Sequence, residues 1–281
     1  MPVDLDSWID ELASSRKYHG IHLPRETLRD LLEQELPRRR SPKEAIRAVR
    51  EKLHHIVAPY LGDPDYDAAA IDLESAFQSG NPVEIQSACA VLLNQHASTR
   101  ERLPHLVEFY RAIFDVTGKP GVILDLACGI HPLGFPWMGL PHTVRYHAWD
   151  LHQPRVALLN RFFRLQGLEE LAFHGDILVN PPQTPADVAF FFKEAHRFEQ
   201  RRRGCNREFW QAIRTRWLVI TLPARSLTGH RLLADQHRRR ERGVPLGPMP
   251  SDVRLRHVPL RRVVELQAVE VRPFAAGVDD R

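Results

Sequence analysis

The feature that most constrains the fold is a change of hydrophobic periodicity near residue 96. Beyond this point, short apolar runs alternate with segments long enough to form helices, a pattern that predicts βα units. The runs cover residues 122–126, 143–149, 171–174, 188–192, 217–222 and 263–271. We therefore predict an α/β fold with a mainly parallel, doubly wound sheet. The last run alternates apolar and polar residues, which favours a half-exposed antiparallel edge strand.

The chain before residue 96 has a helical pattern instead. Apolar residues recur every three to four positions, for example at Leu28, Leu31, Leu32 and Leu36. Residues 41–44, Ser-Pro-Lys-Glu, form a capping box with proline at the first helical position, which predicts a helix start. We expect an all-helical N-terminal domain over residues 1–95, followed by the α/β domain over residues 96–281.

Charge and cysteine content narrow the classes of function. The chain has 39 Lys and Arg against 35 Asp and Glu, a net charge of +4. Basic residues cluster in blocks at 38–52, 197–207 and 237–243, which suit a phosphate backbone, although one such block can be a solvated face. Three cysteines without metal-ligand spacing predict neither a disulfide framework nor a metal site. With no leader-like or membrane-spanning run, we expect a cytoplasmic protein without membrane contact.

The sequence ILDLACG at residues 123–129 predicts a ligand-binding turn. The strand ends in Asp125 and reaches Gly129, where a ligand can approach the backbone. Asp150 closes the next strand after about 20 residues, the interval at which a carboxylate binds ribose hydroxyls in dinucleotide folds. Asp176 closes the third. The pyrophosphate-binding glycine pattern is absent, so S-adenosylmethionine is favoured, while another α/β enzyme or a structural use of these carboxylates stays open.

Several motifs together resemble one known family. HASTRER, VILDLACGIHPL, WDLHQ, GDIL, FFFK and LPARSLTG occur in the order and spacing seen in aminoglycoside-resistance 16S rRNA methyltransferases, which modify a decoding-site guanine at N7. The resemblance extends from about residue 8 to 272. It implies a Rossmann-like class I methyltransferase core that uses S-adenosylmethionine and releases S-adenosylhomocysteine. It also implies that the helical domain docks on the 30S subunit and its 16S rRNA, and we expect the chain to act as a monomer.

The resemblance also implies roles for individual residues. Arg102 would bind the methionine carboxylate, Asp150 the ribose, and Asp176 with Ile177 the adenine. The full set of expected cofactor contacts is Tyr60, Arg102, Asp125, Gly129, Asp150, Asp176 and Ile177. Three alternatives remain at this stage: Asp125 caps backbone amides, Tyr60 belongs to a hydrophobic core, and Ser98 with Glu101 forms a capping box.

Target-side residues follow from the same resemblance and from the basic blocks. Lys193 follows a run of apolar residues at the rim where the carboxylates gather, although it could simply cap the strand. The expected target-side residues are Lys193, Arg225, Ser226 and Glu265. The expected RNA-binding residues are Arg38, Arg39, Arg40, Lys43, Arg47 and Arg231. The chain departs from the family pattern at His131, where asparagine is usual, and at His230, where arginine is usual. It also departs after Lys193, where EAHRF replaces apolar residues, and at LLADQH, which lacks the usual aromatic residue.

The expected chemistry requires no general base, because guanine N7 already carries a free lone pair. The protein would align N7 with the methyl group, exclude water and hold the extruded base. Two rival functions remain open: methylation of another RNA or a small molecule, and ribosome binding with the cofactor but without turnover. The arginine-rich block at 38–52 favours an RNA substrate over a small molecule.

Overall fold

The structure is a computed structural model that describes residues 5–15, 19–57, 63–221, 256–257 and 269–273. Some residues singled out above lie outside this described part of the chain. They are Tyr60, Arg225, Ser226, His230, Arg231 and Glu265. Among the described helices, none is long and apolar enough to cross a membrane.

The first three helices form a small bundle with its own hydrophobic core. They are α1 (Leu5–Ala13), α2 (Arg25–Glu35) and α3 (Pro42–Val57), with short 3₁₀ turns η1 (His19–Ile21) and η2 (Leu36–Arg38). Apolar residues spaced by three or four positions lie on one side of each helix, and these sides close on one another. The predicted capping at the start of α3 is present: the N–H of Glu44 donates to Ser41 Oγ at 3.3 Å, and its carboxylate accepts from the Arg40 N–H at 3.2 Å.

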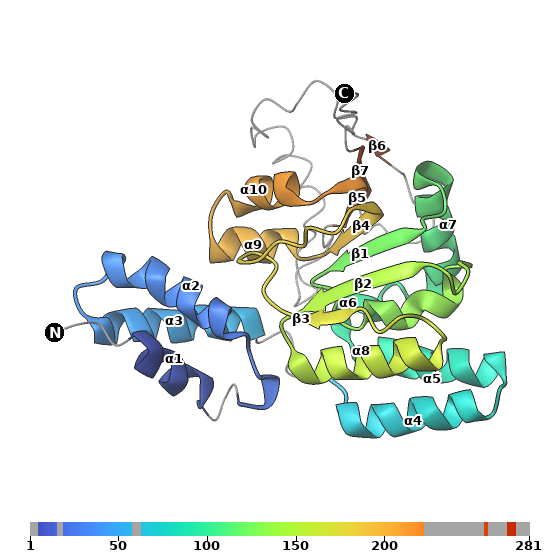
Figure 1. Cartoon of the computed structure of the whole chain (residues 1–281), viewed down its shortest axis with the longest axis horizontal. Helices are drawn as coiled ribbons and strands as arrows, with labels where there is room; N and C mark the ends of the chain where they lie inside the picture. The colour runs from blue at the N-terminus through green and yellow to red at the C-terminus, as the bar shows by residue number, and fades with distance from the viewer. Residues whose placement is uncertain (1–4, 16–18, 58–62, 222–255, 258–268, 274–281) are drawn as a thin grey trace.

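The next two helices pack on the α/β domain. They are α4 (Tyr66–Gln78) and α5 (Pro82–Gln95). Leu73 and Leu93 belong to the same buried cluster as strand and helix residues of the α/β domain. In Figure 1 the bundle α1–α3 extends to the left of the sheet, whereas α4 lies beneath α8 (Gln153–Leu165) and α5 extends to the right of α8. The division between hydrophobic clusters thus falls between Val57 and Ala69, earlier than the predicted boundary at residue 95.

A seven-stranded sheet forms the centre of the α/β domain. Its strands are β1 (Val122–Leu126), β2 (Arg145–Asp150), β3 (Ala172–His174), β4 (Ala186–Phe192), β5 (Thr215–Thr221), β6 (Arg256–His257) and β7 (Val269–Pro273). Their order is β3-β2-β1-β4-β5-β7-β6, and β1 to β5 are parallel. As predicted, β7 is antiparallel, but it pairs with β6 as well as β5 and so does not form the edge.

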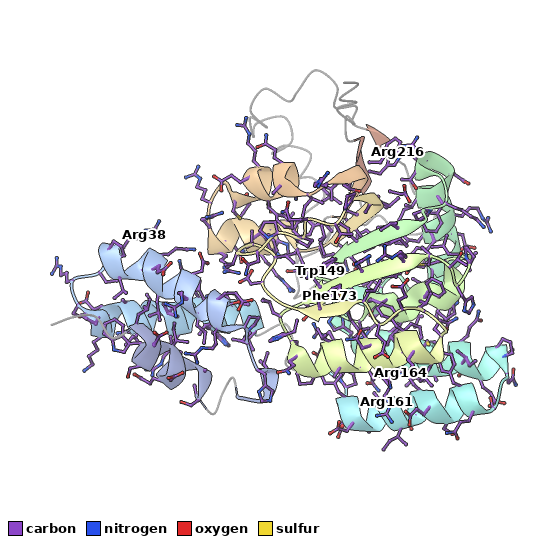
Figure 2. The ribbon with its side chains drawn as sticks, viewed as in Figure 1. Arg38, Trp149, Arg161, Arg164, Phe173 and Arg216 are labelled. Carbon is purple, nitrogen blue, oxygen red and sulfur yellow. The ribbon has the colours of Figure 1, made fainter. Side chains whose placement is uncertain are left out.

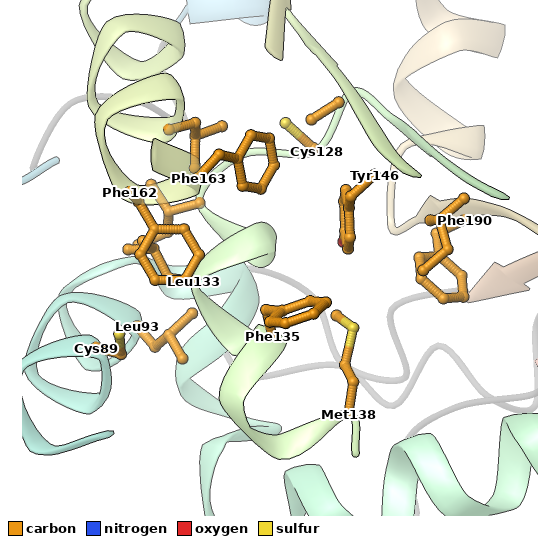
Figure 3. Packing of buried hydrophobic residues seen from close by; sticks show 14 of the residues in the cluster. Cys89, Leu93, Cys128, Leu133, Phe135, Met138, Tyr146, Phe162, Phe163 and Phe190 are labelled. Atoms are coloured by element: carbon orange, nitrogen blue, oxygen red, sulfur yellow. The ribbon is translucent and has the colours of Figure 1, made fainter. Parts of the chain in front are cut away.

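Helices cover both faces of the sheet because successive strand residues point to opposite sides. Ile123 and Phe190 face the large cluster with α4, α5 and α8, whereas Leu124 and Phe191 face α9 and α10. Figure 3 shows the first cluster, in which Leu133 lies between α5 and α8. The helices of this domain are α6 (Ala97–Arg100), η4 (Leu103–His105), α7 (Leu106–Thr117), η5 (His131–Trp137), α8 (Gln153–Leu165), α9 (Ala195–Arg201) and α10 (Cys205–Ala212).

Candidate active site

The turn after β1 brings the backbone close to the end of β2. Gly129 has a φ of +57°, and a Cβ at this position would lie 3.1 Å from Cε1 of His96, so a side chain here would be both strained and crowded. The N–H of Gly129 donates to Asp150 Oδ2 at 2.9 Å. Glycine at this position therefore lets the turn after β1 approach the end of β2 closely.

Asp150 lies at the end of β2 with its carboxylate fully engaged. It accepts from the N–H groups of Gly129 and His152 at 2.9 Å each, and from Arg155 Nη1 at 3.0 and 2.9 Å. Burial alone would raise the pKa of Asp150, but Arg155 and the two N–H groups outweigh it and lower the pKa. A ribose can therefore bind this carboxylate only by sharing or replacing one of these donors.

Arg155 extends this network into the segment that precedes α4. Its side chain has no solvent exposure, and Nη2 donates to Asp63 while Nε donates to the Tyr66 hydroxyl at 3.1 Å. A single buried guanidinium thus joins two carboxylates, Asp63 and Asp150. The sequence analysis missed Arg155, although its place one turn into α8 would have put it within reach of Asp150.

Asp176, after β3, is held by donors from three different elements. Oδ2 accepts from the Thr27 hydroxyl at 2.8 Å and from Arg201 Nη1 at 2.5 Å, and Oδ1 accepts from the N–H of Leu178 at 3.0 Å. The side chain is only 2% exposed. Ile177 beside it is also buried and packs in the cluster of the α9 face.

Asp150, Asp176 and Ile177 line one cleft together at the C-terminal ends of the strands. The cleft encloses about 500 Å³ that opens to solvent, and Ala127, Trp149 and Leu151 contribute further walls. Figure 2 shows Trp149 beside Phe173 near the centre of the molecule, where their rings stack at 4.9 Å. The structure therefore brings together the three residues that the sequence assigns to ribose and adenine.

Arg102 is a buried cation with unused hydrogen-bonding groups. It is 2% exposed, Nη2 donates to the Ser98 carbonyl at 3.0 Å, and Nε and Nη1 have no partner among the described residues. Its guanidinium lies over the ring of Phe192, 4.9 Å from the centroid. Burial is the main cause of its lowered pKa. An anion such as a carboxylate beside the guanidinium would supply acceptors for these unused donors.

The predicted capping box in HASTRER does not form. The Ser98 hydroxyl pairs with His96 Nδ1 at 2.8 Å, and the residue before α6 makes no side-chain cap. Glu101 instead accepts from Lys193 Nζ at 2.5 Å. The helix begins at Ala97 with His96 at the N-cap position, so Ser98 lies inside the helix and cannot act as the capping residue of this motif.

Lys193 directly follows β4 in a conformation that is rare for a residue with a side chain. Its φ is +64°, its N–H donates to the Thr221 carbonyl at 2.9 Å, and it is only 8% exposed. Burial lowers the pKa of Lys193, and Arg102 adds to this, whereas Glu101 raises it. Strain at a buried cation beside Arg102 marks this rim as a functional candidate.

Glu194 is a carboxyl in the cleft that the sequence analysis did not assign. Burial raises its pKa to about 7, Arg197 lowers it and Asp150 raises it further. Arg197 Nη1 donates to it at 2.8 Å. Because the family resemblance predicts apolar residues after Lys193, the departure EAHRF was the available signal for this additional group.

Asp125 and His131 form a network inside the protein. Asp125 Oδ2 lies 2.7 Å from His131 Nδ1 and accepts from the Tyr146 hydroxyl at 2.7 Å. Tyr110 Oη lies 2.8 Å from His131 Nε2. Burial lowers the pKa of His131, which favours a neutral ring that donates to Asp125 and accepts from Tyr110. His131 thus adds a hydrogen bond to Asp125, whose described side-chain partners are His131 and Tyr146.

The predicted RNA-binding residues form an exposed corner at the start of α3. Arg38, Arg39, Arg40, Lys43 and Arg47 are all exposed. Arg39 pairs with Glu35 at 2.8 Å, and Figure 2 places Arg38 on the bundle, on the side away from the sheet. We name these five residues the basic corner. In the same view Arg38 lies apart from Trp149, which belongs to the wall of the cleft.

Comparisons with known proteins agree with this geometry. The family model described as "Ribosomal RNA methyltransferase (FmrO)" matches residues 14–239. The 16S rRNA (guanine(1405)-N(7))-methyltransferase of Frankia casuarinae is 36% identical over 222 residues, 78% of each chain. The enzyme of the same name from Micromonospora echinospora is 33% identical over 186 residues, 66% of this chain and 68% of the relative. The crystal structure of the 16S rRNA methyltransferase RmtF with S-adenosyl-L-homocysteine matches with a TM-score of 0.74 and 28% identity, over 97% of this chain and 99% of that one.

Proposed function

The chain belongs to the FmrO family of ribosomal RNA methyltransferases, and from this premise we propose that it methylates N7 of a decoding-site guanine in 16S rRNA. The substrate would be the 30S subunit, and the modification would confer aminoglycoside resistance. The names of the relatives from Frankia casuarinae and Micromonospora echinospora support this choice of base and atom. We further propose that the protein acts as a monomer in the cytoplasm.

The observation that carries the cofactor assignment is the unsatisfied guanidinium of Arg102. Two unused donors on a buried cation are costly unless a ligand accepts them, and the methionine carboxylate of S-adenosylmethionine would do so. Asp150 would bind the ribose, and Asp176 and Ile177 the adenine. Gly129 would leave room for the methionine moiety beside the turn. The RmtF structure, solved with S-adenosyl-L-homocysteine, supports the same cofactor.

The reaction would rest on placement of the two reactants. S-adenosylmethionine supplies an electrophilic methyl group: the N7–carbon bond forms as the carbon–sulfur bond breaks, and sulfur keeps the electron pair. Because N7 has its own lone pair, the protein residues need only align the base and exclude water. Lys193 would contact the target base or its phosphate, held in place by Glu101 and by the backbone bond to Thr221. Arg225, Ser226 and Glu265 stay predicted target-side residues.

The basic corner would provide the affinity for the subunit. Arginine and lysine side chains bind phosphate without reading the base sequence and make affinity strongly salt-dependent. This arrangement would place the docking surface on the α1–α3 bundle and the reacting groups at the strand ends. The predicted Arg231 would add a further phosphate contact on the α/β domain.

The decisive experiment measures transfer of a labelled methyl group from S-adenosylmethionine to purified 30S subunits, naked 16S RNA and 70S ribosomes. Borohydride and aniline cleavage then locates N7-methylguanine. We expect label on 30S subunits alone and one cleavage in the decoding site. Transfer to a small molecule or to naked RNA would indicate the first rival function. Cofactor binding with no transfer to any substrate would indicate a homologue without turnover.

A further inference from the structure

Helix α2 of the bundle reaches into the cofactor cleft of the other domain. Thr27 is completely buried, and its hydroxyl donates to Asp176 Oδ2 at 2.8 Å. Asp176 lines the cleft at the end of β3. The bundle therefore contacts directly the carboxylate to which we assign the adenine, although the two residues are far apart in the sequence.

A second connection between the domains passes through Arg201 of α9. Its Nη1 donates to Asp176 Oδ2 at 2.5 Å, and its Nη2 donates to Asp30 Oδ2 of α2 at 2.6 Å. The Arg201 side chain is 6% exposed. Charge-assisted hydrogen bonds in such a buried place are stronger than exposed ones, so α2 fixes the Asp176 carboxylate from two directions.

The remaining capacity of Asp176 matches an amine donor. A carboxylate has about four acceptor positions, and Thr27, Arg201 and the Leu178 N–H account for three donors. Two of these donors share Oδ2, whereas Oδ1 accepts only from Leu178 among the described residues. One acceptor position is thus left for the exocyclic amine of adenine, and its direction depends on how Oδ2 is held.

We propose that Thr27 and the Asp30–Arg201 pair are positioning residues for the adenine-binding carboxylate, so that the α1–α3 bundle is part of the cofactor site. This inference rests on the adenine role that the proposed function gives to Asp176. Coupling of two sites is reciprocal: if the bundle's position strengthens cofactor binding, cofactor binding must hold the bundle in that position. The bundle also carries the basic corner, so cofactor binding and subunit docking share one rigid element.

The first test is calorimetric titration of the ribosome-free protein with S-adenosylhomocysteine. Thr27→Val keeps the shape but removes the donor. Because the lost hydrogen bond affects the ligand only through Asp176, binding should weaken by part of the bond's full effect, about fivefold to tenfold. Thr27→Ser retains the hydroxyl and should stay within about twofold of the wild type. The matched control is Thr117→Val, because Thr117 is also buried but its hydroxyl donates to the Gly118 carbonyl on α7, outside the cleft.

A ligand change separates positioning from general loosening of the domain contact. S-inosylhomocysteine has a carbonyl oxygen in place of the exocyclic amine, so the hydrogen bond from this position to Asp176 is lost. S-inosylhomocysteine should bind the wild type more weakly than S-adenosylhomocysteine does. Its affinity for Thr27→Val should lie within about twofold of its affinity for the wild type. Asp30→Asn changes the partner on the other side of Arg201. It should weaken the binding of S-adenosylhomocysteine, but not of S-inosylhomocysteine, by a smaller factor of about twofold to fivefold. Hydrogen exchange should show α2 amides protected by S-adenosylhomocysteine in the wild type and less so in Thr27→Val.

The outcomes differ for this inference and for the proposed function. Equal affinity of Thr27→Val and Thr117→Val for S-adenosylhomocysteine would overturn the inference, and so would an equal loss for both ligands, which indicates loose packing. Neither result affects methyl transfer by the wild type to 30S subunits. Conversely, absence of methyl transfer by the wild type would refute the proposed function. A selective effect of Thr27→Val on the affinity for S-adenosylhomocysteine would still support the positioning role of Thr27.

Discussion

Replacement of Arg102 by methionine should raise the stability of the ligand-free protein. Each buried polar group without a partner costs about 1–3 kcal/mol, and Arg102 has two such nitrogens. The change also removes the charge-assisted bond to the Ser98 carbonyl, about 1.5–3 kcal/mol, and the cation–π contact with Phe192, about 0.5–2 kcal/mol. Methionine keeps the apolar packing. The central values leave a gain of about 0.5 kcal/mol, a rise in melting temperature of about 1–2 °C.

The same change should remove most of the cofactor affinity. Two charge-assisted bonds to the methionine carboxylate, each about 1.5–3 kcal/mol, correspond to a loss of at least about 100-fold. Calorimetric scans with and without S-adenosylhomocysteine, and titration with the same ligand, measure both effects. Arg161→Met is the control, because Arg161 pairs with Glu74 away from the cleft. A variant that melts several degrees lower than the wild type and retains its ligand affinity would show that Arg102 has a structural role instead.

Four further changes test other parts of the site. The stability of Glu194→Gln relative to the wild type should increase as pH rises, because the raised pKa of about 7 means that ionisation of Glu194 above pH 4.5 opposes folding. The difference in unfolding free energy, measured in urea, should grow between pH 5 and 8 to about 2–3 kcal/mol. A difference that does not depend on pH would contradict this reasoning. Arg155→Met leaves Asp63 and Asp150 unpaired and should cost about 3–5 kcal/mol of unfolding free energy, whereas Arg161→Met should leave the melting temperature unchanged. Reversal of charge at Arg39, Arg40 and Arg47 should abolish transfer to 30S subunits and preserve calorimetric binding of S-adenosylhomocysteine; undiminished transfer would rule out docking through the basic corner. Lys193→Ala should lower kcat on 30S subunits at least about tenfold without changing cofactor affinity. An unchanged kcat would show that Lys193 does not act on the target base.

The sequence by itself determined where β1 to β5 lie along the chain and where these strands end. Apolar runs and the small residues between Asp125 and Gly129 act within a few residues of one another, and the carboxylates Asp150 and Asp176 follow their strands directly. Parallel strands end at one edge, so the pattern was enough to predict that these carboxylates share a cleft. The resemblance carried by several motifs then identified Arg102 as a candidate ligand to the methionine carboxylate.

Only the tertiary structure decided what each of these groups touches. The helical pattern before residue 96 does not distinguish α1–α3, which form their own core, from α4 and α5, which pack on the sheet domain. Nor does this pattern show that Glu101 pairs with Lys193, or that the Ser98 hydroxyl pairs with His96. Hydrophobic periodicity reports which face of a segment is buried, but not against which partner.

The contacts of Asp150 and Asp176 show the physical reason most clearly. Asp150 is bonded to Arg155, which in turn reaches Asp63, and Asp176 is bonded to Thr27. These partners come from segments distant in the chain and meet only when the bundle and the sheet have packed. The charge and hydrogen-bonding state of a buried carboxylate depends on the donors within a few ångströms, whatever their place in the chain. Local sequence therefore determined where the acidic groups lie, and the packing of the two domains determined how they are held.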